Sequence, residues 1–227
     1  SIVFDKAGIS QIDGALLDFG VSSHQLDKPE RGFSYQYEAP LDMRMDKQNS
    51  LTAKTVVNEY SEAELKKILF EYGEERFSPS IAAAIVRARQ SAPIETTAQL
   101  SDIIRGAIPA FAREGGHHPA KRSFQAIRIE VNGELRILRN AIEDFLDALN
   151  PGGRLAIITF HSLEDKIVKD YFATLKQGCT CPKDFPVCVC GKTPRAIVKS
   201  GGVKAGQKEL DNNKRSRSAK LRTALKI

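Results

Sequence analysis

Two short apolar segments, each followed by polar residues, constrain the fold of this chain more than any other feature. Residues 15–19 (ALLDF) and 154–160 (RLAIITF) have the length and apolar character of strands buried in a parallel sheet. The second is entered through a Pro-Gly-Gly turn, and residues 163–176 after it place apolar side chains on one helical face. A strand, a loop and a helix in this order predict an α/β domain.

The sequence between these two strands carries helical signals. A capping box at Ser61 starts one helix, and further start signals occur at Ser78-Pro79 and Thr97. A longer helical pattern follows, which Gly133 is expected to kink or split. We therefore expect a small helical insertion in an α/β domain, with the insertion at 45–115 and the α/β domain at 1–44 and 116–227.

The positive charge of the chain is concentrated near its carboxyl end. The net charge is +6, but residues 192–227 alone carry eleven Lys and Arg against two acidic residues. A basic tail of this kind suggests a polyanionic partner, with nucleic acid as the leading candidate. Lys214, Arg215 and Arg217 are its densest cluster. The alternative is a solvated tail that aids solubility.

Targeting signals are missing from the sequence as given. No run reaches the roughly eighteen apolar residues of a membrane span, and no charged-then-apolar secretory leader is present. A cytoplasmic setting without a membrane partner is therefore expected. The sequence starts at Ser1 without an initiator Met, so we expect an incomplete amino-terminal part.

Polar residues follow both predicted strands. Asp18, Ser22 and Ser23 come after the first strand, and the second strand is followed by His161, Ser162, Glu164 and Asp165. Ligands of open α/β sheets bind beyond the carboxyl ends of strands. A single strand-end Asp can simply cap a helix, but two such ends in one domain favour a ligand pocket. The pattern does not name the chemistry.

An aromatic and charged loop follows the first strand. Phe33, Tyr35 and Tyr37 can stack on a nucleobase, although aromatic residues at a period of two also suit a half-buried extended segment. Asp42 and Arg44 can shape a pocket in this loop. The alternative is a weak ion pair on an ordinary surface loop.

The four cysteines of the chain form one local cluster, Cys179-x-Cys181 and Cys188-x-Cys190. Their number matches a four-thiolate zinc site, whereas their C-x-C spacing is tighter than the usual C-x2-4-C. Unliganded thiols are the alternative. Fingerprints of other sites are missing from the sequence, which has no G-x-S-x-G elbow, Walker lysine loop or G-x-G-x-x-G.

Several long blocks of the sequence are distinctive: DGALLDFGVSSHQLDKPERGFSYQYEAPLDMRMD, YGEERFSPSIAAAIVRAR, HPAKRSFQAIRIEVNGEL, PGGRLAIITFHSLEDKIVK and NKRSRSAKLR. Through these blocks essentially the whole chain resembles the bacterial RsmH (MraW) family. The resemblance implies a Rossmann-like class I methyltransferase domain, here incomplete at its amino terminus, with an inserted helical subdomain. It also implies methylation of a cytosine N4 amino group in 16S ribosomal RNA of the small ribosomal subunit, with S-adenosylmethionine as methyl donor.

The family resemblance carries two cofactor contacts to this chain, Asp18 and Gln25. We further expect Asp18 to orient the cytosine amino group with Ser22 and Ser23, and Phe33 to stack on the base. For His161 two roles are open, a proton relay or a hydrogen bond to the first loop.

The family also begins with a glycine-rich loop and an acidic ribose-binding strand, which lie upstream of Ser1 and are not in this chain. Without them we expect weak cofactor binding, and an exposed edge on the first strand that favours self-association. The alternative function is therefore a catalytically inactive RNA-binding fragment of such an enzyme.

Overall fold

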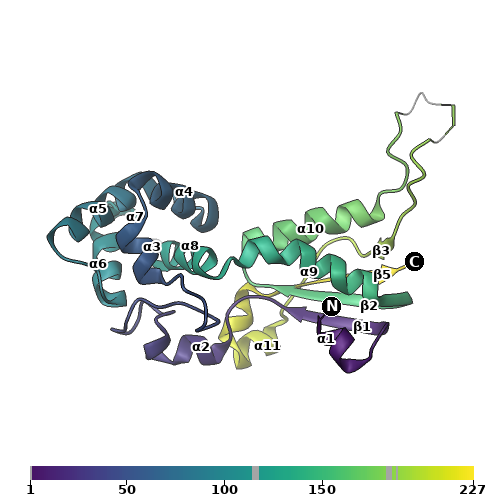
Figure 1. Ribbon diagram of the computed structural model, residues 1–227, viewed down its shortest axis with the longest axis horizontal. Coiled ribbons are helices and arrows are strands. Elements are labelled where there is room, and N and C mark those ends of the chain that lie inside the picture. The colour runs from purple at the N-terminus through teal and green to yellow at the C-terminus, as the bar shows by residue number, and fades with distance from the viewer. Residues whose placement is uncertain (1, 114–117, 183–185, 188) are drawn as a thin grey trace. The chain divides into compact units, whose positions relative to one another are not determined.

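The computed structural model describes residues 2–113, 118–182, 186–187 and 189–227 and divides the chain into two compact units (Figure 1). Unit 1 combines residues 1–20 with 135–227, and unit 2 is the continuous stretch 21–134. Unit 2 contains the whole expected insertion of 45–115 and extends beyond it on both sides. It is wider because Phe33 and Leu41 on one side and Phe124 on the other belong to the same apolar core.

Unit 1 is built on a mixed sheet. Its strands are β1 (Ile12–Asp18), β2 (Leu149–Thr159), β3 (Ala196–Val198), β4 (Val203–Lys204) and β5 (Lys220–Lys226). The strand order is β1-β2-β5-β3, and β4 also pairs with β5. β1 and β2 are parallel, whereas β5 is antiparallel to each of its neighbours. The two apolar segments therefore form adjacent parallel strands, and the predicted α/β class is confirmed.

Helices cover one face of this sheet. The helices of unit 1 are α1 (Ile2–Ala7), α9 (Glu134–Ala148, whose first residue belongs to unit 2), α10 (Ser162–Lys176), α11 (Gln207–Asn212) and the 3-10 helix η2 (Lys214–Ser218). α9 and α10 lie along the sheet (Figure 1) and bury Leu146 and Phe172 against Leu155 and Ile157 of β2. The helix predicted at 163–176 is confirmed as α10.

β1 differs from the buried strand that its apolar sequence predicted. Its Leu16 side chain is 66% exposed, and Asp18 at its end is exposed too. The reason is its place in the sheet, because within the described residues β2 is its only strand partner. Apolar composition alone did not reveal that, among the described residues, no strand pairs with the other edge of β1 and that Leu16 faces solvent.

The basic segment at 192–227 is not a solvated tail. It supplies β3, β4 and β5, and β5 lies between β2 and β3 in the sheet. Several of its basic side chains bond to partners inside unit 1, namely Arg195, Lys220, Arg222 and Lys226. These four side chains are therefore engaged in the fold.

Unit 2 is helical. Its elements are α2 (Ser23–Asp27), the 3-10 helix η1 (Pro29–Arg31), α3 (Ala53–Glu59), α4 (Glu62–Gly73), α5 (Ser78–Ser91), α6 (Thr97–Ala107), α7 (Ala110–Arg113) and α8 (Lys121–Asn132). The predicted capping box is present, since Ser61 Oγ accepts from the Glu64 N–H at 3.2 Å and Glu64 Oε2 from the Ser61 N–H at 2.8 Å. The expected split is confirmed too, because Gly133 ends α8 with a φ of 60°. Among the described helices, none has the length and apolar character to cross a bilayer.

Candidate functional site

The carboxyl ends of β1 and β2 lie side by side. Asp18, the last residue of β1, is in register with Ile158, and the N–H of Phe19 donates to the Ile158 carbonyl at 3.1 Å. The Asp18 side chain is exposed, and within the described residues its carboxylate has no hydrogen-bond or ion-pair partner. It does not cap a helix, because Ser22 is the N-cap of α2. This carboxylate is therefore available to a ligand.

The start of α10 fixes two titratable side chains beside the end of β2. Glu164 is buried, and its Oε2 accepts from the backbone N–H groups of Phe160 and His161 at 2.8 and 3.3 Å. His161 Nδ1 in turn accepts from the Glu164 N–H at 3.5 Å, which completes a capping box. His161 Nε2 lies 3.2 Å from Glu164 Oε1 but is not aligned as a hydrogen bond. The imidazole thus serves to start the helix.

Asp165, the next residue of α10, joins this helix to β5. Its carboxylate accepts from Arg222 Nε at 2.6 Å and from Lys220 Nζ at 2.8 Å. The hydrogen bond from Arg222 is the main cause that lowers the pKa of Asp165 below its ordinary value. The carboxylate of Asp165 is therefore bonded within the fold, whereas that of Asp18 has no partner among the described residues.

The residues expected to act with Asp18 start α2 in unit 2. Ser22 Oγ accepts from the Gln25 N–H at 3.2 Å, and Gln25 Oε1 accepts from the Ser22 N–H at 2.9 Å. Ser23 is exposed in the first turn of this helix. The oxygen of Gln25 is therefore occupied, while its amide NH2 has no partner among the described residues.

Asp42 and Arg44 form one ion pair inside the loop that precedes α3. Arg44 donates to both carboxylate oxygens of Asp42, from Nε at 2.8 Å and from Nη2 at 2.9 Å. This pairing lowers the pKa of Asp42. Arg44 also donates to the backbone carbonyls of Lys47 and Asn49. The pair is a structural element of the loop and more than a weak surface contact.

The three aromatic side chains of the loop have different environments. Phe33 is 5% exposed and belongs to the core of unit 2. Tyr35 stacks on His118 with ring centroids 4.3 Å apart. Tyr37 is 47% exposed. The buried position of Phe33 does not support the expected stacking on a base, and Tyr37 is the most exposed of the three rings.

The basic candidates lie on η2 in unit 1. Lys214, Arg215 and Arg217 are exposed, whereas Ser216 between them is buried and donates to the Asn213 carbonyl at 2.7 Å. Asn213 Oδ1 also accepts from the Arg215 N–H at 3.2 Å. The short helix therefore has a fixed inner side and presents basic side chains to solvent.

A possible metal site lies in the segment after α10. The Sγ atoms of Cys179, Cys181 and Cys190 are all within 4.8 Å of one another. Cys188, the fourth cysteine expected there, lies outside the described residues. The sulfurs of three of the four cysteines that were predicted to bind a metal therefore lie close together.

The sequence places Glu164 and Asp165 after the second strand, but the capping role of Glu164 and the salt bridge of Asp165 with β5 were not predicted. The first had a readable signal, because Glu164 lies three residues after the N-cap His161, where a capping box places its acid. The salt bridge had no signal in the local sequence, because Asp165 and Arg222 are 57 residues apart.

Adjacent parallel strands, an exposed carboxylate at their carboxyl ends and helices on the sheet define unit 1 as a Rossmann-like α/β domain with a ligand-binding edge. The family model described as "MraW methylase family" matches residues 2–227. The chain belongs to this family.

Several curated relatives are similar to this chain over nearly its whole length. It is 57% identical over 226 residues to the "Ribosomal RNA small subunit methyltransferase H" of Symbiobacterium thermophilum, covering 99% of this chain and 71% of that protein. A protein of the same name from Ruminiclostridium cellulolyticum is 56% identical over 221 residues, with 97% and 71% covered. The one from Heliobacterium mobile is 56% identical over 228 residues, with 100% and 73% covered.

Proposed function

We propose that this protein transfers a methyl group from S-adenosylmethionine to the N4 amino group of a cytosine in 16S ribosomal RNA, in the cytoplasm. Membership of a methylase family and the names of the relatives support the reaction class and the RNA substrate. The observation that carries the proposal is the exposed carboxylate of Asp18 at the end of β1. Methyl transfer to an amino group requires an acceptor for its N–H.

The residues at the strand end suit a cationic cofactor with hydrogen-bond donors. Asp18 offers a carboxylate without a partner among the described residues, and Gly20 turns the chain away from β1 with a φ of 91°. The free amide NH2 of Gln25 adds a donor. Asp18 of unit 1 and Gln25 of unit 2 are, by the family resemblance, the residues that would hold S-adenosylmethionine. When bound, this cofactor supplies an electrophilic methyl group on a sulfonium sulfur.

The task of the protein is to position a weak nucleophile. The N4 lone pair of cytosine is delocalised into the ring, so the nitrogen must be held in line with the methyl group. We assign to Asp18 the hydrogen bond from the N4 amino group, and the proton that this group loses as its new N–C bond forms. The exposed hydroxyl of Ser23 is a second acceptor, whereas Ser22 Oγ is engaged at the start of α2.

The target base must leave any stack before it can react. We assign the stacking surface to Tyr37, because Phe33 is enclosed in the core of unit 2. Asp42 and Arg44 are proposed to shape the pocket, because their bidentate pair fixes the part of the same loop at 42–49. His161 is proposed as a positioning residue at the end of β2, since both of its ring nitrogens face Glu164.

The basic side chains of η2 are proposed to contact the RNA backbone. Lys214 and Arg217 are exposed, and neither has a hydrogen-bond or ion-pair partner among the described residues, whereas Arg222 is bonded to Asp165. Phosphate contacts of this kind release counterions, so binding should weaken steeply with salt. Replacing these two side chains by alanine tests the RNA contact and leaves β5 intact. A deletion of 214–222 would remove the first residues of β5.

Zinc, the other cofactor expected from the sequence, has no part in this transfer step. The cysteines follow the carboxyl end of α10, whereas the ends of β1 and β2 adjoin its amino end. The fifteen residues of α10 span about 21 Å. A metal held by the cysteines would therefore be structural.

The experiment compares Asp18→Asn with the wild type, in this chain and in a full-length relative, using labelled S-adenosylmethionine and small ribosomal subunits. Asp18→Asn should reduce methyl transfer by about 10²-fold or more while the unfolding midpoint stays unchanged. Asp170→Asn, an exposed acid on α10, is the matched control. Lys214→Ala with Arg217→Ala should lower RNA affinity and its salt slope but leave cofactor binding intact.

Near-normal turnover of Asp18→Asn in the full-length relative would refute the role of Asp18. If the chain bound RNA but neither bound the cofactor nor transferred methyl, the alternative function, a noncatalytic RNA-binding fragment, would be supported.

A further inference from the structure

Residues 177–194, which we call the cysteine loop, lie between α10 and β3, and those of them that the structure describes are irregular. The two ends of the loop are held together, because the N–H of Arg195 donates to the Leu175 carbonyl at 2.8 Å. Gly178 packs against Pro194, where an added Cβ would lie 3.2 Å from Cδ. The loop thus leaves unit 1 and returns to it at the same place (Figure 1).

The described part of the cysteine loop contains neither a helix nor a strand. Its large apolar side chains Val187 and Val189 are 69% and 73% exposed, so they build no apolar core. Short segments without a core are commonly fixed by a disulfide or a metal ion. Some such constraint is therefore needed if the loop is to hold one conformation.

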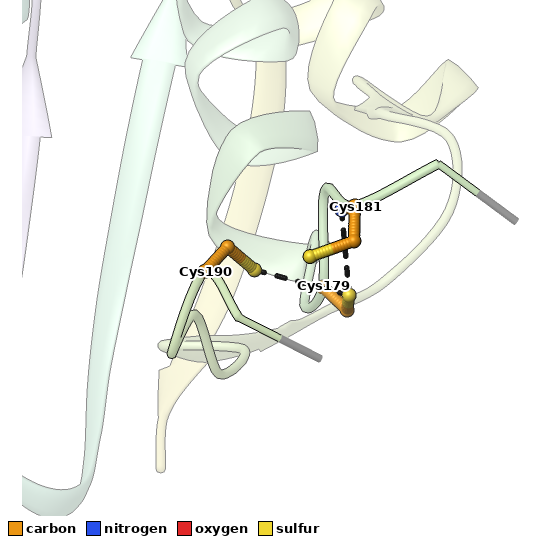
Figure 2. A group of neighbouring side chains, drawn as sticks. All are labelled: Cys179, Cys181 and Cys190. Carbon is orange, nitrogen blue, oxygen red and sulfur yellow. Dashed lines mark hydrogen bonds between the residues drawn. The ribbon is translucent and has the colours of Figure 1, made fainter. Parts of the chain in front are cut away.

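Three thiols from the two branches of the loop lie close together (Figure 2). Cys179 and Cys181 come from the outgoing branch and Cys190 from the returning one, and their sulfurs are within 4.8 Å of one another. The sulfurs of Cys179 and Cys190 are 3.8 Å apart. Zn–S bonds of about 2.3 Å in a tetrahedron give S–S separations of about 3.8 Å. A disulfide needs about 2.05 Å.

Backbone N–H groups point at two of these sulfurs. The N–H of Thr180 donates to Cys190 Sγ at 3.4 Å, and that of Cys181 donates to Cys179 Sγ at 3.4 Å. Hydrogen bonds to the ligand atoms orient them and tune their charge in metal sites. The first of these bonds also joins the two branches of the loop.

We propose that Cys179, Cys181 and Cys190 bind a zinc ion that ties the two branches of the cysteine loop together. Soft thiolates favour zinc over hard cations such as Mg²⁺ and Ca²⁺. Each thiol gives up its proton as its sulfur binds the metal. Three thiolates leave one tetrahedral position for a further ligand. The site is independent of the proposed methyl transfer.

The test is a metal titration of the whole chain, stripped with a chelator and kept reduced. Co²⁺ should bind at one ion per chain with a thiolate-to-cobalt charge-transfer band and tetrahedral visible bands, and Zn²⁺ should displace it. Cys179→Ser, Cys181→Ser and Cys190→Ser should each weaken binding at least about tenfold. Thr180→Ala is the matched control, because it keeps the backbone N–H that bonds to Cys190. Zn²⁺ should also slow tryptic cleavage after Lys192.

Three results would overturn the proposal. The first is a reduced wild type that binds no Co²⁺, or binds it without a thiolate band. The second is serine variants that bind as tightly as Thr180→Ala. The third is freshly isolated protein in which alkylation and mass measurement find Cys179 and Cys190 joined as a disulfide. Unfolding curves recorded without metal identify any variant that fails to fold, and such a variant is replaced by its alanine counterpart.

Discussion

Two irregular segments of the molecule, residues 28–52 in unit 2 and the cysteine loop in unit 1, are held in different ways. In the first, the Arg31 guanidinium donates to the carbonyls of Arg44 and Met45, at 2.7 and 3.2 Å. The cysteine loop has two exposed valines and three converging thiols instead. The comparison teaches that an irregular segment keeps one conformation in one of two ways: through internal hydrogen bonds and an apolar core, or through a cross-link.

Segment 28–52 is fixed firmly enough to hold a backbone conformation that side chains rarely adopt. Met43 is fully buried and has a φ of 61°. Asn132 of α8 holds the backbone on both sides of it, donating to the Met43 carbonyl at 2.8 Å and accepting from the Met45 N–H at 2.7 Å. Such a conformation persists when the surroundings determine it.

The largest effect is expected for Gly32→Ala in this segment. Gly32 has a φ of 69°, and an added Cβ would lie 2.2 Å from the Pro40 carbonyl oxygen. The backbone must move, so we expect a loss of roughly 3 kcal/mol or more in the free energy of unfolding. Urea denaturation measures it. Gly106→Ala in α6, where nothing lies within 4 Å, is the control and should raise stability by roughly 0.5–1 kcal/mol. Equal midpoints for the two variants would contradict the rigidity of this segment.

A smaller, pH-dependent effect is expected for Asp42→Asn. The hydrogen bond from Arg44 lowers the pKa of Asp42 in the folded protein. The pair therefore stabilises the fold above the ordinary Asp pKa of 3.8, and this contribution is lost as the pH falls through the lowered folded value. We expect Asp42→Asn to cost roughly 1–2 kcal/mol at pH 7 and progressively less below pH 4. A difference that persisted unchanged in acid would show that the charge is not its source.

The smallest effect is expected in the cysteine loop without metal. Because the loop has no core, Cys181→Ser in the presence of a chelator should change the free energy of unfolding by less than about 0.5 kcal/mol. Urea denaturation with and without the chelator makes the comparison. A large loss in the chelator would mean that contacts of the thiol itself hold the loop, and the contrast with segment 28–52 would disappear.

The parts of the fold that follow from local signals were predictable from the sequence. The capping box at Ser61 and the glycine break at Gly133 depend on neighbouring residues only, and both are confirmed. The exposure of Leu16 was not predictable, because it depends on which strands and helices adjoin β1. The same holds for the basic segment, whose folding into β5 depends on pairing with β2.

In the candidate site the sequence predicted which residues lie at the strand ends but not what they contact. Asp18 was expected at the carboxyl end of a parallel strand and lies there. The engagement of Asp165 by Arg222 and of Met45 by Asn132 joins residues 57 and 87 positions apart, and no local pattern reports such contacts. Aromatic residues at a period of two fit both a base-stacking loop and a half-buried segment. The pattern therefore did not decide whether Phe33 is buried.

The register of β1 on β2 has a consequence for the time course of folding. Ile12 pairs with Leu149, so the parallel strands cannot meet until a long intervening stretch has been brought back on itself. Unit 2 occupies most of that stretch. Part of its packing, α4 on α5 and α5 on α6, joins helices that are neighbours in sequence, and such local contacts develop fast. A helical body that condenses early shortens the path that β1 must span. The sheet should therefore be the late, slow step of folding, and amides of β2 should gain hydrogen-exchange protection after those of α4.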